Sequence, residues 1–298
     1  MNLDKIGEFG LIERILKKIK TDRSVICGIG DDTAVISYTK DKYLLFTTDM
    51  LIEDIHFTRK EATFPQIGRK ALAVNISDIA AMGGIPKYAV VSVGIPRDLC
   101  VRSADDLMRG INTLAKEYMV NIVGGDTVRS DKIILSVSLI GEVKKSDLTL
   151  RSGAKTGDLI FVSGTLGGSR KLKQFNFIPR VKEAQEIIKK FRPTAMIDLS
   201  DGLAADLQRI AQASKAGAVL FKELIPLSRG ATVQSAFYEG EDFELLFTVP
   251  LEAVCKFYKK DKFPITCIGK IVEKKKGLAL INKQAKSTPL RQKGFKHF

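Results

Sequence analysis

The sequence contains little of what several classes of protein require. Among its 298 residues there is no tryptophan, there are only two histidines, and the four cysteines lie far apart without a CxxC pair. Zinc and iron–sulfur sites use clustered cysteine and histidine, so the sequence argues against both kinds of site. We expect the cysteines to be reduced and buried, as small apolar side chains are.

Long apolar runs are absent as well. No stretch approaches the roughly 18 uninterrupted apolar residues of a membrane span, and the first ten residues, MNLDKIGEFG, lack the apolar core of a secretion signal. We therefore expect a cytoplasmic protein that does not contact a membrane. With 45% apolar residues, the chain can bury the core of one large domain or two ordinary ones.

Positive charge is in excess, because 48 Lys and Arg face 34 Asp and Glu and give a formal net charge of +14. Such an excess could indicate nucleic acid, an anionic membrane or a phosphorylated small molecule as the partner. The sequence has no aromatic RNA-binding pattern and no helix-turn-helix signature, and short lysine runs such as 274–276 are typical of solvated surfaces. We predict no nucleic-acid partner and keep a basic nucleic-acid-binding protein as a remote alternative.

Within this basic chain, acidic residues gather in Gly-rich or apolar segments. Two carboxylates about 4 Å apart, at an effective dielectric constant near 20, repel each other by on the order of 4 kcal/mol. If these acids converge, they require protons or hard cations such as Mg²⁺. We interpret them as metal ligands: Asp31, Asp32, Asp49, Asp78, Asp126, Asp198, Asp201, Glu241, Asp242 and Glu244.

Three of the acidic segments also have a simpler explanation. GIGDD can be an ordinary glycine turn, and Asp78, inside an apolar helical stretch, can bond to backbone amides. Ser200 or Asp201 can cap the helix that follows them. Asp198 precedes the cap position, which leaves it available as a ligand.

Strand ends are the other predicted location of site residues. We expect Asp49 to close one strand, and Asp126 to follow a short strand and two glycines that allow close approach. An isolated histidine is often structural, but His56 follows soon after Asp49, and a partly protonated imidazole there can hold a phosphate. Glu244, at the start of a later strand, is the candidate polar contact in the second half.

Arg151 and Lys155 are the candidate cations for a triphosphate. They lie in the polar segment 144–157, which we predict to connect two domains, 1–145 and 146–298, each with strands and helices in an α+β arrangement. The chain has no GxxxxGK[ST] phosphate loop and no HRD or DFG kinase motif. The sequence therefore predicts a polyanion held by Mg²⁺ without a Walker A motif.

These segments, in this order, resemble the thiamine-monophosphate kinase family of the aminoimidazole-ribonucleotide-synthetase-like ATP-binding superfamily. The resemblance covers nearly the whole chain, although the stretch 170–179 looks shorter than in relatives and the tail has GFKHF where relatives often place a tryptophan. The matching segments are GEFGLIERI, GIGDDTAVI, TTDMLIEDIHF, KALAVNISDIAAMGG, VGGDTVRS, TLRSGAKTGDLIFVSGTLG, AMIDLSDGLAADL, GEDFELLFTVP, CIGKI and GFKHF.

The resemblance implies direct in-line transfer of the γ-phosphate of ATP onto thiamine monophosphate, assisted by several Mg²⁺ ions. It implies a homodimer formed through the sheet of an N-terminal α/β domain, with a C-terminal α/β domain that closes over the site. The implied metal ligands are Asp32, Thr47, Thr48, Asp49, Asp78, Asp126, Asp198 and Asp201, of which Asp32, Asp78, Asp126 and Asp198 are the implied catalytic residues. The implied ATP contacts are Gly125, Asp126, Arg151 and Ser200, and the implied thiamine-phosphate contacts are His56, Glu244 and Phe295.

Other members of the superfamily are the nearest alternatives. The segment LIEDIHF argues against aminoimidazole ribonucleotide synthetase, and the positions of the cysteines argue against selenophosphate synthetase and the hydrogenase-maturation dehydratase. A non-catalytic metal-binding protein is a further alternative, which would bind nucleotide without turning it over.

Overall fold

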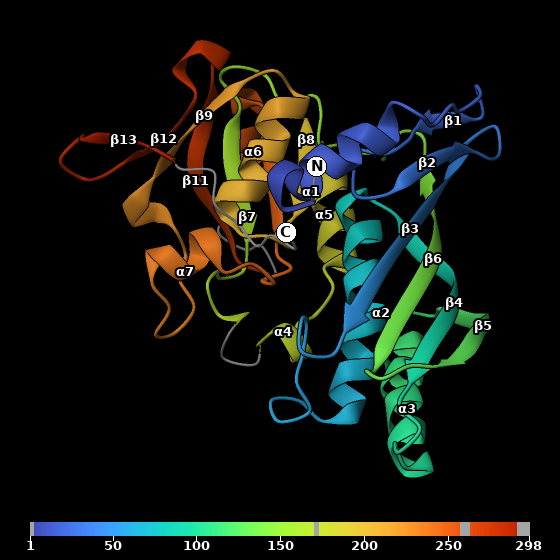
Figure 1. The fold of residues 1–298 in the computed structure, drawn as a ribbon. Coiled ribbons are helices and arrows are strands. Elements are labelled where there is room, and N and C mark those ends of the chain that lie inside the picture. Colours follow the sequence, from blue (N-terminus) through green and yellow to red (C-terminus); the bar gives the residue numbers. More distant parts are fainter. Residues whose placement is uncertain (1–2, 170–172, 257–262, 291–298) are drawn as a thin grey trace.

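A computed structural model describes residues 3–169, 173–256 and 263–290 of the chain. Two sheets follow each other in the sequence, the first ending at Lys144 and the second beginning at Leu159. Helix α2 (Phe64–Ala81) stands between the first sheet and the C-terminal half (Figure 1). No helix in the described ranges is long and apolar enough to cross a membrane.

The N-terminal sheet has six strands in the order β1-β2-β3-β6-β4-β5. Its neighbours are antiparallel except for β4 and β5, which run parallel. The strands are β1 (Val25–Cys27), β2 (Ala34–Ser37), β3 (Lys42–Ile52), β4 (Ile85–Ile95), β5 (Asn121–Arg129) and β6 (Ile134–Lys144), and the helices besides α2 are α1 (Leu3–Leu16) and α3 (Val101–Glu117).

Helix α2 has the sequence of a helix that is buried on nearly all sides. At its start, the side chain of Gln66 accepts a hydrogen bond from the backbone N–H of Thr63 at 3.0 Å. Pro65 lies in the first turn, where backbone N–H groups have no partner within the helix, so the N–H that proline lacks costs no hydrogen bond. The helix packs against α3, against β3 and β6, and against elements of the C-terminal half. Polar residues on α2 therefore lie at the junction of the two halves.

The opposite face of the N-terminal sheet is not covered within the described chain. Four large apolar side chains on this face remain exposed, Phe46 by 45%, Met50 by 51%, Tyr88 by 49% and Val90 by 40%. Exposed large apolar side chains gathered on one face of a sheet are typical of an interaction site.

The C-terminal sheet has seven strands in the order β13-β12-β9-β11-β7-β10-β8, antiparallel except for the pair β12 and β9. The strands are β7 (Leu159–Ser163), β8 (Ala195–Asp198), β9 (Gly217–Phe221), β10 (Leu245–Val249), β11 (Ile265–Val272), β12 (Leu278–Ile281) and β13 (Ser287–Pro289). The helices are α4 (Lys173–Asn176), α5 (Val181–Phe191), α6 (Leu203–Ala213) and α7 (Val233–Tyr238), with 3₁₀ turns η2 (Lys222–Leu224), η3 (Leu251–Lys256) and η4 (Lys274–Lys276).

Strand β10 shows how the two halves share a core. Leu245 and Phe247 pack in the apolar cluster that also contains the residues of α2, whereas Leu246 packs in the cluster that contains the residues of α6. Successive side chains of a strand point to opposite faces, so this sheet is buried on both sides.

Two predictions about strand ends are wrong. Asp49 lies inside β3, because β3 stays paired with β6 as far as Ile52. Asp126 lies inside β5, because the pairing with β4 continues through the glycines to Arg129. Strand β1, helices α4 and α7 and strand β13 were not predicted, since elements of three to six residues are too short for a periodic pattern.

Candidate active site

Three carboxylates meet where the two halves of the chain come together. Asp32 follows β1, Asp78 lies on α2, and Asp198 is the last residue of β8. One oxygen of each lies within 4.8 Å of the others, and Asp198 is only 1% exposed. Residues far apart in the sequence thus form one buried acidic cluster, which we call the carboxylate cluster.

Burial and mutual repulsion raise the pKa values of these acids. Burial, followed by the charges of Asp49 and Asp198, raises the pKa of Asp78 well above its usual range. Burial and then the charge of Asp32 do the same to the pKa of Asp198. Burial, with Asp201 and Asp32 nearby, raises the pKa of Asp49 to about 6. In the absence of a cation, the site therefore favours protonated carboxyl groups.

Hydroxyl groups hold two of the acids in place, while one oxygen has no partner. The Ser77 hydroxyl donates to Oδ2 of Asp198, and the Thr47 hydroxyl donates to Oδ2 of Asp78, both at 2.5 Å. Oδ2 of Asp32 is buried and has no hydrogen-bond partner among the described residues. An unpaired buried oxygen is costly unless a cation binds it. The set of oxygen donors therefore fits a hard cation such as Mg²⁺.

Arg151 borders the carboxylate cluster. Its Nη2 donates to Oδ1 of Asp32 at 2.5 Å, and its backbone N–H donates to Oδ2 of Asp31 at 3.0 Å. Burial opposes the charge, but Asp32 and Asp31 raise the pKa of Arg151 above its usual range, so the guanidinium stays cationic. Lys155, the other expected cation, is exposed, and its backbone N–H donates to Asp158 at 2.9 Å.

Arg209 and Asp206, both on α6, extend this charged region and were not predicted. Arg209 forms ion pairs with Asp201 and Asp206. Burial raises the pKa of Asp206 to about 7, although Arg209 works in the opposite direction. The signal in the sequence was the Asp–Arg spacing of three residues, which places both side chains on one helix face. Ser200 lies half-buried in the loop between Asp198 and α6.

Glu244 is paired with cations rather than with the other acids. Nε and Nη2 of Arg180 each donate to its carboxylate at 2.8 Å, the Ser163 hydroxyl donates at 2.7 Å, and Nζ of Lys173 lies at 3.2 Å. The general interpretation of the acidic segments as metal ligands therefore does not extend to Glu244. The carboxylate of Glu244 is instead the buried centre of a small ion-pair network with Arg180 and Lys173.

His56 has a defined ring orientation. Its Nδ1 accepts the backbone N–H of Ile52 at 3.0 Å, so the neutral ring carries its proton on Nε2. The side chain is half-buried, and its backbone carbonyl accepts a hydrogen bond from Lys70 at 2.9 Å. Phe295, the third expected substrate contact, lies outside the described residues.

Asp126 and Thr48 lie apart from the carboxylate cluster. Asp126 is exposed on β5 and stands opposite Ser92, also exposed, on β4. Strands β6 and β4 separate β5 from β3, which corresponds to roughly 14 Å at the usual strand spacing. The Thr48 hydroxyl donates to the carbonyl of Val137 at 3.2 Å and accepts from Ser138 at 3.0 Å. A single chain does not bring these two side chains to the other acids.

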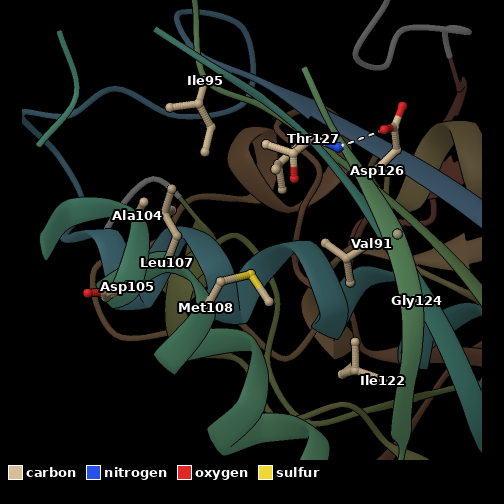
Figure 2. A pocket seen from close by; sticks show the side chains of 12 residues that line it. Val91, Ile95, Ala104, Asp105, Leu107, Met108, Ile122, Gly124, Asp126 and Thr127 are labelled. Atoms are coloured by element: carbon tan, nitrogen blue, oxygen red, sulfur yellow. Dashed lines mark hydrogen bonds between the residues drawn. The ribbon is translucent and has the colours of Figure 1, made fainter. Parts of the chain in front are cut away.

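A pocket of about 450 Å³ lies beside Gly125, between β5 and α3. Figure 2 shows the apolar side chains of α3 facing those of the neighbouring strands across this space. Gly125 leaves no room for a side chain, because a Cβ there would lie 1.9 Å from the carbonyl oxygen of Val91. The lining residues are Val91, Val93, Ile95, Ala104, Asp105, Leu107, Met108, Ile122, Gly124, Gly125, Asp126 and Thr127.

Comparisons with known proteins agree with this geometry. The family model described as AIR synthase related protein, N-terminal domain, matches residues 30–143, and that of the C-terminal domain matches residues 155–281. The thiamine-monophosphate kinase of Bacillus subtilis is 36% identical over 98% of this chain and 100% of its own length. That of Aquifex aeolicus is 36% identical over 100% of both chains.

A solved structure extends the similarity to three dimensions. The structure of AaThiL complexed with AMPPCP and TMP aligns with a TM-score of 0.87 at 34% identity, and the alignment covers 100% of this chain and 99% of that one. Both halves match the AIR synthase-related fold, which confirms the predicted two-domain α+β class. The chain therefore belongs to the thiamine-monophosphate kinase family, a family of phosphotransferases within the AIR synthase-related proteins.

Proposed function

We propose that this protein uses ATP to phosphorylate thiamine monophosphate, and that thiamine diphosphate and ADP are its products. The observation that carries the proposal is the carboxylate cluster, in which acids from both halves of the chain converge on one buried point. Family membership supports it, since the named relatives are thiamine-monophosphate kinases and one related structure is a complex with AMPPCP and TMP.

The acids at the junction are the proposed Mg²⁺ ligands. Bound Mg²⁺ would neutralise the charge that accumulates on the ATP phosphates and on the acceptor phosphate during transfer. The unpaired oxygen of Asp32 and the raised pKa values of Asp78 and Asp198 support this assignment. The proposed ligands within one chain are Asp32, Thr47, Asp49, Asp78, Asp198 and Asp201.

Arg151 is the proposed contact to the ATP phosphates. Its guanidinium stays cationic and its side chain is 17% exposed, so its donors can reach a ligand at the cluster. A planar guanidinium suits phosphate oxygens because it can donate two parallel hydrogen bonds. Ser200, between Asp198 and α6, is the second proposed ATP contact.

His56 and Glu244 are the proposed contacts to thiamine monophosphate. The Nε2–H of His56 is suited to donate to the acceptor phosphate. Arg180 and Lys173 form ion pairs with Glu244 and add positive charge beside its carboxylate. The acceptor phosphate is already ionised near neutral pH, so direct in-line transfer requires positioning and charge neutralisation but no general base.

The pocket beside Gly125 is the proposed place for the nucleotide base. Its apolar lining, with Leu107, Met108 and Ile122, suits a planar aromatic ring, and the neighbouring Asp126 and Thr127 are polar. Gly125 lets β5 lie close against the Val91 carbonyl of β4 at the edge of this pocket. With the base in this pocket, Gly125 and Asp126 would contact ATP, as the family resemblance implies.

A second copy of the chain is the proposed cover for the exposed face of the N-terminal sheet. Phe46, Met50, Tyr88 and Val90 form the apolar part of this face, and the family resemblance implies a dimer through this sheet. Pairing two copies would also explain why Asp126 stands apart from the acids of its own chain. Sedimentation should report a dimer, and Phe46→Lys should convert it to a monomer.

The domain limits 1–145 and 146–298 and the cytoplasmic location stay predictions.

A coupled assay tests the proposed activity. The purified protein is mixed with ATP, Mg²⁺ and thiamine monophosphate, and the product is separated from thiamine monophosphate by chromatography. We expect thiamine diphosphate and ADP in equal amounts, and no product when EDTA is present. Turnover of an aminoimidazole precursor instead would favour the synthetase alternative. Binding of nucleic acid that weakens steeply with salt and ignores Mg²⁺ would favour the alternative of a basic nucleic-acid-binding protein.

A further inference from the structure

Lys70 is a charged residue buried in helix α2, and its side chain is 0% exposed. Its Nζ donates to the carbonyl of His56 at 2.9 Å and to Oε1 of Gln174 at 3.1 Å, forms an ion pair of 2.5 Å with Glu241, and lies 5.0 Å from the ring of Phe175. Burying an ammonium group is costly unless all of its donors are used. Lys70 thus joins three segments that are far apart in the sequence.

The segment that carries Glu241 has an unusual backbone. Glu241 has φ 58° and Phe243 has φ 50°, in the left-handed region that non-glycine residues rarely adopt. Such a conformation persists only when surrounding contacts enforce it. The ion pair with Lys70 holds Glu241, and the carboxylate of Asp242 accepts the backbone N–H groups of Gly167 at 2.6 Å and Gly168 at 3.1 Å.

This strained loop touches both ends of the proposed site. The backbone N–H of Glu241 donates to the carbonyl of Ser200 at 2.8 Å, next to the acids of the carboxylate cluster. At its other end the loop carries Glu244, whose partner Lys173 is adjacent in sequence to Gln174, a partner of Lys70. The loop therefore connects Glu241, the ion-pair partner of Lys70, with Glu244.

Helix α2 fixes the distance between Lys70 and Ser77. Lys70 and Ser77 are two helical turns apart on one side of the helix, which corresponds to about 10 Å along its axis. Ser77 holds Asp198 of the carboxylate cluster, and Lys70 holds the backbone of His56 and the loop of Glu244. One rigid helix thus connects the two places where the proposed donor and acceptor phosphates bind.

We propose that Lys70 is a positioning residue, which fixes the thiamine-phosphate contacts His56 and Glu244 relative to the carboxylate cluster. The inference rests on the proposed function, because it assigns Lys70 to the acceptor end of that site. Lys70 touches no reacting atom and acts through the His56 backbone and through Glu241. Its loss should therefore weaken the binding and alignment of the acceptor much more than the binding of the nucleotide.

The experiment compares Lys70→Met, Glu241→Gln and the double variant with the wild type. Methionine keeps most of the volume of the lysine stem and removes the charge. The control is Lys42→Met, which breaks an ion pair of 2.6 Å with Glu142 at the far end of β3. For each protein, kcat and the KM values for thiamine monophosphate and ATP are measured, circular dichroism checks folding, and calorimetry measures binding of thiamine monophosphate.

We expect Lys70→Met to lower kcat/KM for thiamine monophosphate by about 10- to 100-fold, since small misplacements near a reacting centre have effects of that size. The KM for ATP should stay within about twofold, and Lys42→Met should match the wild type. The Lys70 and Glu241 effects should not be additive, because the two residues form one pair.

Two results would overturn the assignment of Lys70. One is a folded Lys70→Met protein with wild-type affinity for thiamine monophosphate, and the other is an equal loss for both substrates, which would indicate a general structural role. If Lys70→Met fails to fold, Glu241→Gln decides the question, because the Glu241 side chain is 30% exposed and its change is milder. Turnover by the wild type tests the proposed function separately. The ratio of kcat/KM for thiamine monophosphate between the variant and the wild type tests the positioning role of Lys70.

Discussion

Replacing Asp78 by asparagine should stabilise the metal-free protein while it destroys activity. Asp78 and its neighbours Asp32 and Asp198 bring three carboxylate oxygens within 4.8 Å of one another. Asparagine keeps the shape and still offers Oδ1 to the Thr47 hydroxyl, but it carries no negative charge. The variant thus removes repulsion from the cluster and also removes a proposed Mg²⁺ ligand.

The magnitude follows from the distance between the acids. At a separation of at most 4.8 Å and an effective dielectric constant near 20, two ionised carboxylates repel by at least about 3.5 kcal/mol. Protonation already relieves part of this repulsion in the metal-free protein, as the raised pKa of Asp78 indicates. We therefore expect the free energy of unfolding to rise by about 1 to 3 kcal/mol, or several degrees in Tm.

Thermal unfolding with EDTA and with Mg²⁺ provides the assay, alongside kcat. For Asp78→Asn we expect a higher Tm in EDTA, a smaller rise in Tm on adding Mg²⁺, and a fall in kcat of at least about 100-fold. Asp41→Asn, the same change at an exposed turn between β2 and β3, should match the wild type in all three. A metal-free Asp78→Asn protein no more stable than the wild type, with an undiminished Mg²⁺ response, would refute the reasoning.

Two further substitutions probe the supporting structure. Ser77→Ala removes the hydroxyl that donates to Asp198, so Mg²⁺ affinity should fall by about 10- to 100-fold with little change in fold, as measured by the Mg²⁺ dependence of turnover. An unchanged Mg²⁺ dependence would show that Asp198 needs no such support. Gly125→Ala places a Cβ 1.9 Å from the Val91 carbonyl oxygen and should destabilise the protein by about 1 to 3 kcal/mol and weaken ATP binding. Gly124→Ala, whose Cβ would lie 3.7 Å from the nearest atom, is the matched control, and equal effects of the two would contradict the steric explanation.

The sequence predicted the carboxylate cluster because its acids lie in apolar surroundings. Asp78 lies in a largely apolar stretch of α2 and Asp198 ends an apolar strand, and a buried charge requires a partner wherever the fold puts it. The same argument applies to Lys70, which precedes the apolar run ALAVNI in the same helix. Lysines in a basic chain usually lie at the surface, so the sequence alone does not place Lys70 in the core.

The positions that the sequence did not predict depend on strand order and on distant partners. The separation of Asp126 from Asp49 arises because β6 and β4 lie between β5 and β3, and no local pattern specifies that order. The ion pair of Glu244 could not be predicted from the sequence, since its partner Arg180 lies 64 residues earlier in the chain. Side-chain pairing over such a distance is a property of the tertiary fold alone.

The apolar layer shared by the two sheets makes each half dependent on the other. Phe161, Met196 and Phe247 project from the C-terminal sheet into the cluster that contains α2. A C-terminal fragment that begins near the connecting segment would leave these side chains in water, and the N-terminal fragment would leave the facing side of α2 exposed. Separately produced halves should thus precipitate or recombine into an active pair, and the intact chain should melt in a single cooperative step.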